Sequence, residues 1–193
     1  MKRFFEYGGI IASVILIAFG AGSIGVSAKG LNDVRDRLAA QNITAGDDAA
    51  EITNGKLQPG QKIDSGAEAE QLAKIMEFHT LEATEGKRYA EMGRFLTPEG
   101  TDTNDEALAA KDPRTDRPVE NGLRNMWVTE TALTTALNTS YFAEQVAYFG
   151  IAMGVALLLT GIGFLVLTLG GVLQVAPKFA RTPAAPKSTA AVV

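Results

Sequence analysis

An unbroken apolar run near the C-terminal end constrains this chain more than any other feature. Residues 146–173 carry no charged side chain over 28 positions, and they lie inside a longer uncharged stretch, residues 145–177. About 20 apolar residues in a helix are enough to cross a bilayer whose hydrocarbon core is about 30 Å thick. The core helix of a soluble protein needs no run of this length, so we predict a transmembrane helix over residues 146–173.

A second uncharged apolar run, residues 7–28, predicts that the chain enters the membrane twice. The alternative is a cleaved signal peptide, because Lys2 and Arg3, the apolar run and the sequence Val-Ser-Ala at 26–28 resemble the three regions of such a signal. The run of about 20 apolar residues exceeds the ~7–15 typical of a signal peptide, which favours a retained anchor.

The distribution of charge predicts the orientation. The two ends carry five basic residues against one acidic residue, whereas the segment between the apolar runs carries 13 basic and 21 acidic residues. Basic residues beside a span stay in the cytoplasm. We therefore expect both termini in the cytoplasm of a bacterial plasma membrane and the acidic middle segment outside. Lys29, Arg35 and Arg37, just after the first run, oppose this assignment.

Charge and cysteine content exclude several classes of function. An acidic outer segment offers nucleic acid no cationic surface from which binding would release counterions, so nucleic acid is not an expected partner. The sequence has no cysteine, which excludes disulfides, thiolate sites and lipidation on cysteine. Membrane lipid, the chain itself and a larger membrane complex are the expected partners.

Within the middle segment, a capping box marks the start of one helix. Ser65 and Glu68 have the spacing at which each side chain reaches the other residue's free backbone N–H. We predict a helix over residues 66–95, with a kink or break at Gly86 because glycine costs ~1 kcal/mol within a helix. Its apolar stripe is expected to include Leu72, Ile75, Met76, His79 and Ala83.

The other outer elements follow from periodicity and turn residues. The first apolar helix is expected to continue over residues 29–41. Residues 42–63 predict a loop. The Asn-Gly pair at 54–55 is a hairpin signal, but its flanks are only about three residues long, so a small β ribbon is the alternative. Residues 97–118 contain three prolines and predict a second loop with one helical turn at 105–111.

The last helix is expected to be very long. Apolar residues recur at threes and fours from residue 119, and no proline interrupts the chain before Pro177. One helix of about 50 residues would join an outer part, 119–145, to the span. The predicted fold class is an all-α membrane protein with two transmembrane helices plus an extracytoplasmic helical bundle with long loops. Its predicted parts are cytoplasmic residues 1–6, spans 7–28 and 146–173, outer residues 29–145 and a disordered cytoplasmic tail, 174–193.

Small residues recur in both apolar runs at the spacing that lets membrane helices approach closely. Helix association in lipid depends on packing, because lipid tails are as apolar as leucine. The sequence leaves open whether the contact is between the two spans, with another copy or with another protein. The expected helix-packing residues are Gly8, Ala12, Ala18, Gly22, Gly150, Gly154 and Gly161.

Hydroxyl and acidic side chains precede the second span. The hydroxyls can bond to carbonyls of their own helix, or they can line a polar seam against a neighbour. The residues of this candidate seam are Thr131, Thr134, Thr135 and Glu144. If copies assembled in a ring, Glu130, Glu144 and Gln145 could line a cation path.

A search for chemical motifs predicts no catalytic, cofactor-binding or metal site. His79 is the only histidine, and zinc and iron sites on side chains usually need two or more histidines or cysteines. We expect it on a packed helix face. Asp102, Asn104 and Glu106 faintly resemble a calcium loop, but Ala107 and Pro113 stand where glycine and glutamate are needed. A solvated acidic loop is the simpler interpretation.

Two stretches, residues 79–96 and 125–171, resemble a group of small, uncharacterised two-span membrane proteins of actinobacteria. The resemblance runs over about residues 64–173 and implies the same two-span topology. Some members carry the label "aromatic ring-opening dioxygenase". Such enzymes bind iron through two histidines and a carboxylate, and this chain has His79 alone, so we do not expect that activity.

The sequence therefore favours a non-catalytic two-pass plasma-membrane protein, an accessory or scaffold component that packs through glycine-rich spans and an outer helical bundle. The alternative is a self-assembling homo-oligomer that forms a pore or channel. A ligand sensor is a third class, but the short cytoplasmic ends leave no room for an output domain.

Overall fold

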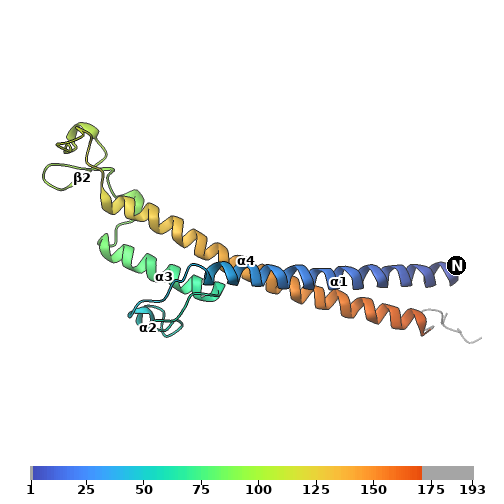
Figure 1. Cartoon of the computed structure of the whole chain (residues 1–193). Coiled ribbons are helices and arrows are strands. Elements are labelled where there is room, and N and C mark those ends of the chain that lie inside the picture. The colour runs from blue at the N-terminus through green and yellow to red at the C-terminus, as the bar shows by residue number, and fades with distance from the viewer. Residues whose placement is uncertain (1, 171–193) are drawn as a thin grey trace, which may run out of the picture. The chain divides into compact units, whose positions relative to one another are not determined.

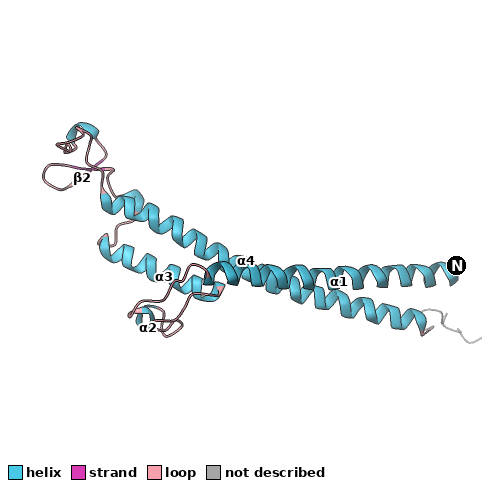
Figure 2. Cartoon of the chain, in the orientation of Figure 1, coloured by secondary structure: helices cyan, strands magenta, loops and turns pink. Residues whose placement is uncertain are grey.

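The computed structural model describes residues 2–170, and among them the side chains from residue 7 onward. The last residues of the expected second span and the expected tail, 174–193, lie outside the described residues. The described chain is mostly helical (Figures 1 and 2). Its α-helices are α1 (Lys2–Ala39), α2 (Ala49–Ile52), α3 (Gly66–Ala83) and α4 (Gly122–Leu169).

Two helices, α1 and α4, are long and apolar enough to cross a membrane. In the most apolar 18-residue window of each, only 11% is buried within the chain. The core helix of a soluble protein would be mostly buried, whereas most of these side chains are not covered by the rest of the described chain. The expectation of a mostly helical chain with two apolar helices of spanning length is confirmed.

The chain divides into two compact units, and α1 and α4 contribute to both. Of the described residues, the helix-pair unit comprises 2–24 and 152–170, and the core unit comprises 25–151. Within the helix-pair unit, α1 and α4 lie side by side in opposite directions, because the backbone of Gly9 lies against Thr168 and that of Gly20 lies against Gly154.

The core unit is built around one apolar cluster to which α1, α3 and α4 all contribute. Burying such side chains is the main favourable term in folding, at roughly 25 cal/mol per Å² of apolar surface. Four of its nine buried members are alanines and the other five are leucines and isoleucines. Its buried members are Leu38, Ala45, Ala49, Leu57, Ile63, Ala69, Ala73, Ile75 and Leu137.

The predicted helix over 66–95 is wrong in its second half, since α3 ends at Ala83. Glu85 and Gly86 both have positive φ, and the N–H of Gly86 donates to the carbonyl of Leu81 at 2.7 Å. This is the bond with which glycine closes a helix C-terminus. Beyond it the chain forms a 3₁₀ helix, η1 (Tyr89–Glu91), and a short strand, β1 (Phe95–Leu96).

The Asn-Gly pair at 54–55 also ends a helix, so the alternative of a β ribbon at this pair is wrong. Asn54 and Gly55 have positive φ, and the N–H of Gly55 donates to the carbonyl of Ala50, in α2, at 2.7 Å. The extended pairing in this segment is a single bridge between Thr44 and Lys62. Asn-Gly favours positive φ in either setting, so the pair alone does not separate a turn from a helix end.

The second loop is more ordered than its composition predicts. Strand β1 pairs with β2 (Asp102–Thr103) in an antiparallel hairpin, and a 3₁₀ helix, η2 (Glu106–Leu108), supplies the expected helical turn. Residues 118 and 120 also make bridges, to Lys111 and Phe95. Helix α4 therefore begins at Gly122 instead of residue 119, and it continues unbroken for 48 residues as expected.

Candidate functional site

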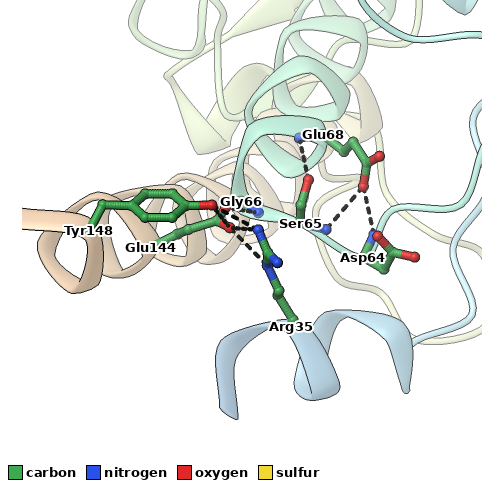
Figure 3. Close-up of polar contacts among 7 residues, drawn as sticks. All are labelled: Arg35, Asp64, Ser65, Gly66, Glu68, Glu144 and Tyr148. Atoms are coloured by element: carbon green, nitrogen blue, oxygen red, sulfur yellow. Dashed lines mark hydrogen bonds and ion pairs between the residues drawn. The ribbon is translucent and has the colours of Figure 1, made fainter. Parts of the chain in front are cut away.

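The most elaborate polar cluster that the described residues form is centred on Glu144, whose side chain is 1% exposed. Its Oε1 accepts hydrogen bonds from Nε and Nη2 of Arg35 at 3.0 and 2.7 Å, and from the Tyr148 hydroxyl at 3.2 Å. Its Oε2 accepts from the backbone N–H of Gly66 at 2.5 Å. Figure 3 shows the side chains of Arg35, from α1, and of Glu144 and Tyr148, from α4, beside the backbone nitrogen of Gly66 at the start of α3. We call these four residues the Glu144 cluster.

The Glu144 cluster satisfies a carboxylate that would otherwise be costly to bury. An unpaired buried charge costs several kcal/mol, and an ion pair repays this only when the remaining lone pairs are also bonded. Here both carboxylate oxygens have donors. Arg35 also donates to the Tyr148 hydroxyl at 2.8 Å, which fixes the guanidinium. Both oxygens are engaged, so the cluster joins helices and offers no free acid or base.

The carboxylate of Glu144, a residue of α4, also lies at the N-terminus of α3, where free N–H groups favour a negative charge. Gly66 is the first residue of this helix. The predicted capping box is confirmed beside it, because the Ser65 side chain accepts from the N–H of Glu68 and Glu68 accepts from the N–H of Ser65. The helix end is thus satisfied partly by its own cap and partly by α4.

The second carboxylate at this helix end is Glu68. Burial raises its pKa, but hydrogen bonds from the backbone N–H of Asp64, the Gln61 side chain and Ser65 outweigh that effect and hold the pKa below its ordinary value. These donors bond to the charged form. Glu68 therefore stabilises the start of α3 as a carboxylate.

Gly66 is required at the Glu144 cluster for steric reasons. A Cβ built on Gly66 would lie 2.5 Å from Oε2 of Glu144 and 2.8 Å from the Cα of Tyr141. Both distances are below those of real Cβ contacts, and the second involves backbone that cannot turn aside. Only glycine lets the end of α3 approach α4 closely enough for the carboxylate to bond to its N–H.

Sequence reasoning named Glu144 but not its partners. From the sequence, Arg35 is a basic residue beside the first span, Gly66 is the first residue of a helix, and Tyr148 belongs to the second apolar run. An acidic residue two positions before a long uncharged run is unusual enough to require a partner, and that is the signal the sequence offered. The partner itself is 109 residues away, so spacing cannot identify it.

The candidate polar seam is not assembled within the chain. Thr131 and Thr135 are exposed, and the hydroxyls of Thr134 and Thr139 donate to carbonyls of their own helix at 3.4 and 2.7 Å. Thr135 and Glu144 are nine residues apart, which is two and a half helical turns at 3.6 residues per turn. They lie on opposite faces of α4, so one seam within this chain does not contain both.

The expected helix-packing residues divide between a contact face and an open face. Gly154 and Gly161 are buried against α1: a Cβ on Gly154 would lie 2.8 Å from the carbonyl oxygen of Gly20, and one on Gly161 would lie 2.9 Å from the backbone N of Ile17. Gly150 is half-buried in the core unit. The contact on α1 is made by residues outside the expected set.

Those residues of α1 are Gly9, Ser13 and Gly20. Ser13 is fully buried, and its hydroxyl donates to the carbonyl of Gly9 at 2.7 Å. Opposite them Thr168, 2% exposed, donates to the carbonyl of Phe164 at 2.7 Å. Each hydroxyl is satisfied by its own helix, so the contact requires no bond between helices and depends on close packing.

The other small residues of α1 face away from α4. A Cβ on Gly8 or Gly22 would meet no atom within 4 Å, and Ala12 and Ala18 are exposed. We call these four residues the open small face. Their four-residue spacing predicts helix packing, and α4 is not the helix against which these residues lie.

His79 does not lie on the packed face of α3, contrary to the sequence prediction. Its side chain is 49% exposed, and its Nε2 is 2.6 Å from Oδ2 of Asp48. Ala83, another expected member of the apolar stripe, is exposed as well. No group of three or more potential metal ligands occurs among residues 2–170.

The acidic loop is held by hydrogen bonds that its side chains accept from the backbone just before it. Oδ2 of Asp102 accepts a short hydrogen bond from the N–H of Gly93, and Oδ1 of Asn104 accepts from the N–H of Arg94 at 3.2 Å. The bond from Gly93 outweighs desolvation and lowers the pKa of Asp102. The residues that resembled a calcium loop therefore hold the β1–β2 hairpin to the preceding turn.

Comparison with known proteins adds no assignment. No protein-family model, no curated protein and no solved structure matches this chain. The resemblance to two-span actinobacterial proteins stays an expectation from the sequence.

Proposed function

We propose that this chain is a non-catalytic, two-pass protein of the plasma membrane that acts as an accessory or scaffold component. In this proposal residues 29–145 lie outside the cell, both termini lie in the cytoplasm, and the partner is a membrane protein or a second copy of the chain. The single observation that carries the proposal is the open small face of α1, which α4 leaves uncovered.

The open small face suits contact with another membrane helix. Because no hydrophobic effect drives helices together in lipid, association depends on surfaces that permit close approach. Gly8 and Gly22 are fourteen residues apart, about 21 Å along the helix at 1.5 Å per residue. A partner helix would therefore find small residues over most of the ~30 Å hydrocarbon thickness.

The polar residues of the core unit support a structural role. Both oxygens of Glu144 are engaged by donors from α1 and α3. The exposed His79 is paired with Asp48 and belongs to no group of three potential metal ligands among the described residues. The pore alternative names Glu130, Glu144 and Gln145 as the lining of a cation path, and the bonds of Glu144 to Arg35 and Gly66 engage one of these three residues within the chain.

Retention of the first apolar segment is part of the proposal. In the helix-pair unit, residues 9–20 contact α4 through glycines, and a cleaved signal peptide would have no use for this surface. Mature protein that begins at Lys29 would contradict the proposal. N-terminal sequencing of protein from its native membrane tests this point.

Orientation is testable with single cysteines, because the sequence contains none. Thr115→Cys, in the exposed acidic loop, is expected to react with a membrane-impermeant maleimide on intact cells. Lys2→Cys and Lys187→Cys are expected to react only after the membrane is opened. Labelling of Lys187→Cys from outside would contradict the proposed topology.

Partner docking is tested by crosslinking in native membranes followed by mass spectrometry. We expect the wild-type chain to crosslink to a defined partner or to a second copy. We expect this crosslink to be absent in Gly22→Leu. The matched control is Gly163→Leu, since Gly163 is also open to its surroundings but lies on α4. A wild-type chain recovered only as a monomer, or a partner retained by Gly22→Leu, would overturn the proposed docking.

A further inference from the structure

The core unit contains an apolar cavity of about 520 Å³ that opens to the surface. Small-molecule sites usually have volumes of about 300–1,000 Å³, apolar walls and a few polar groups that fix orientation. Walls come from α1, α3, α4 and the loop after α1, so the cavity depends on how the domain is packed. Its apolar side chains are those of Leu38, Ile43, Leu72, Met76, Leu133, Ala136 and Leu137.

The polar groups of this cavity are few and are concentrated near one end of α1. Arg37 and Gln41 belong to that end, and Ser140 belongs to α4. The Ser140 hydroxyl already donates to the carbonyl of Ala136 at 3.1 Å. The guanidinium of Arg37 is thus the only charged group in the lining, and it is cationic.

Arg37 differs from the neighbouring basic residues of α1. Lys29 is paired with Asp33 and Arg35 with Glu144, but no ion pair found among residues 2–170 includes Arg37. A guanidinium presents paired donors that match a carboxylate or a phosphate. The cavity thus combines an apolar chamber with an uncommitted anion-binding group at its edge.

The cavity also lies close to the apolar runs along both helices. Ser140 precedes residue 146 by six residues, about 9 Å of helix, and Arg37 follows Ala28 by nine residues, about 14 Å. A bilayer's polar region adds about 5–8 Å beyond each side of its hydrocarbon core. The cavity therefore lies within about three helical turns of the end of each apolar run.

From these features, we propose that the cavity binds a single-chain anionic amphiphile, with its apolar tail among the leucines and its carboxylate or phosphate at Arg37. Apolar surface that faces water in the empty cavity would be covered by the tail. The cationic Arg37 favours an anionic head group, and the apolar walls favour a ligand with an apolar tail. This activity is independent of which protein docks on the open small face.

The test uses the full chain in nanodiscs made of a zwitterionic lipid. Oleate is the anionic probe, the uncharged glycerol ester of oleate has the same tail without the charge, and butyrate has the charge without the tail. Wild-type protein is expected to bind oleate saturably, to bind the uncharged ester at least tenfold more weakly, and not to bind butyrate. Lysophosphatidic acid with the same tail distinguishes a phosphate head from a carboxylate, and binding of either supports the proposal.

Two variants separate the site from uptake by the bilayer. Arg37→Gln, at an exposed position, is expected to weaken oleate at least tenfold and to leave the uncharged ester unchanged. Ala136→Phe fills the cavity and is expected to abolish saturable binding of both. Lys29→Gln removes a cation of α1 outside the cavity and is the matched control, with wild-type affinity expected.

Three results would overturn the proposal. They are uptake of both oleate and lysophosphatidic acid equal to that of protein-free nanodiscs, affinity for the uncharged ester equal to that for the anionic ligand that binds, and unchanged affinity for that anionic ligand in Arg37→Gln. Because Arg37 is exposed, that variant keeps the proposal falsifiable even if Ala136→Phe does not fold.

Discussion

Two stretches of one helix, residues 9–24 and 25–39 of α1, contact α4 by different means. In the first stretch the contact consists of glycines and a buried serine, with the two backbones touching. In the second it consists of a buried ion pair at Glu144 and apolar side chains of the core. The first suits lipid, where packing is the available attraction, and the second suits water, where burial and paired charge fix the arrangement.

The largest effect is expected from enlarging a glycine of the helix-pair unit. Gly20→Leu places a side chain where even a Cβ would lie 2.7 Å from backbone atoms of α4, at Gly154 and Leu158. We expect a loss of about 3 kcal/mol, the upper end for overpacking. This loss is measured by unfolding the protein in mixed micelles with an increasing fraction of sodium dodecyl sulfate.

Gly22→Leu is the control for this substitution, because Gly22 lies two residues away on the same helix and faces no atom within 4 Å. Its unfolding midpoint is expected to equal that of the wild type. Equal losses in the two variants would mean that α4 does not contact α1 through the glycine face.

The second largest effect is expected at the Glu144 cluster. Removing one partner of a buried pair costs about 3–5 kcal/mol, but Arg35 is 44% exposed and a glutamine oxygen can still accept from Gly66. For Glu144→Gln we therefore expect a loss of about 2 kcal/mol in the core unit. Fluorescence of Trp127, the only tryptophan, reports the transition.

Asp33→Asn breaks the exposed Lys29–Asp33 pair of the same helix and is the control for Glu144→Gln. Exposed pairs at this spacing contribute about 0.3–0.5 kcal/mol. If both variants lose the same small amount, Glu144 does not act as a buried junction of three helices.

A smaller loss is expected from Gly66→Ala, whose Cβ would collide with Oε2 of Glu144 and with backbone at Tyr141. Overpacking of this kind costs about 1–3 kcal/mol. The higher helix propensity of alanine offsets part of this loss. Gly122→Ala is the matched control, because Gly122 also begins a helix but faces open space. Thermal melts should show Gly66→Ala destabilised and Gly122→Ala unchanged or slightly stabilised.

The smallest effect concerns Glu68 and depends on pH. Its pKa is lowered in the folded chain, so its stabilisation is present above the unfolded pKa of about 4.3 and is lost as pH falls through the folded pKa. At pH 7 we expect Glu68→Gln to be less stable than the wild type by about 1 kcal/mol, the size of a typical cap.

That difference should disappear in acid, because protonated Glu68 and glutamine both lack the charge. The difference is measured from the urea unfolding midpoints of the wild type and Glu68→Gln at pH 7, 5, 4 and 3. A difference that stays constant down to pH 3 would show that the charge of Glu68 does not stabilise α3.

Local signals in the sequence predicted the long helices well. The uncharged runs, the absence of proline before Pro177 and the capping box at Ser65 each depend on neighbouring residues, and α1, α4 and the start of α3 follow from them. Helix ends were harder. Gly86 was correctly identified as a break, but apolar residues beyond it suggested a continuing helix, whereas they pack in a turn and a hairpin.

The candidate site could be predicted only in part, because its partners are distant in the chain. Glu144 and Gly154 were named from their own surroundings, but Arg35 and Gly20 were not. Which face of α1 meets α4 depends on the relative rotation of two helices, and both faces of α1 carry small residues at the same spacing. The sequence pattern is therefore compatible with either face.

A designed disulfide tests most directly whether the two apolar helices pair through the glycine face. A Cβ on Gly9 would lie 3.6 Å from the Cβ of Thr168, within the ~3.5–4.5 Å that a disulfide requires, and the crowding atoms of Thr168 are lost in the Cys variant. On oxidation in membranes, Gly9→Cys with Thr168→Cys should form a bond within one chain, and Gly8→Cys with Thr168→Cys should not. Equal yields in the two pairs, or bonds only between chains, would contradict the packing of α1 on α4 described above.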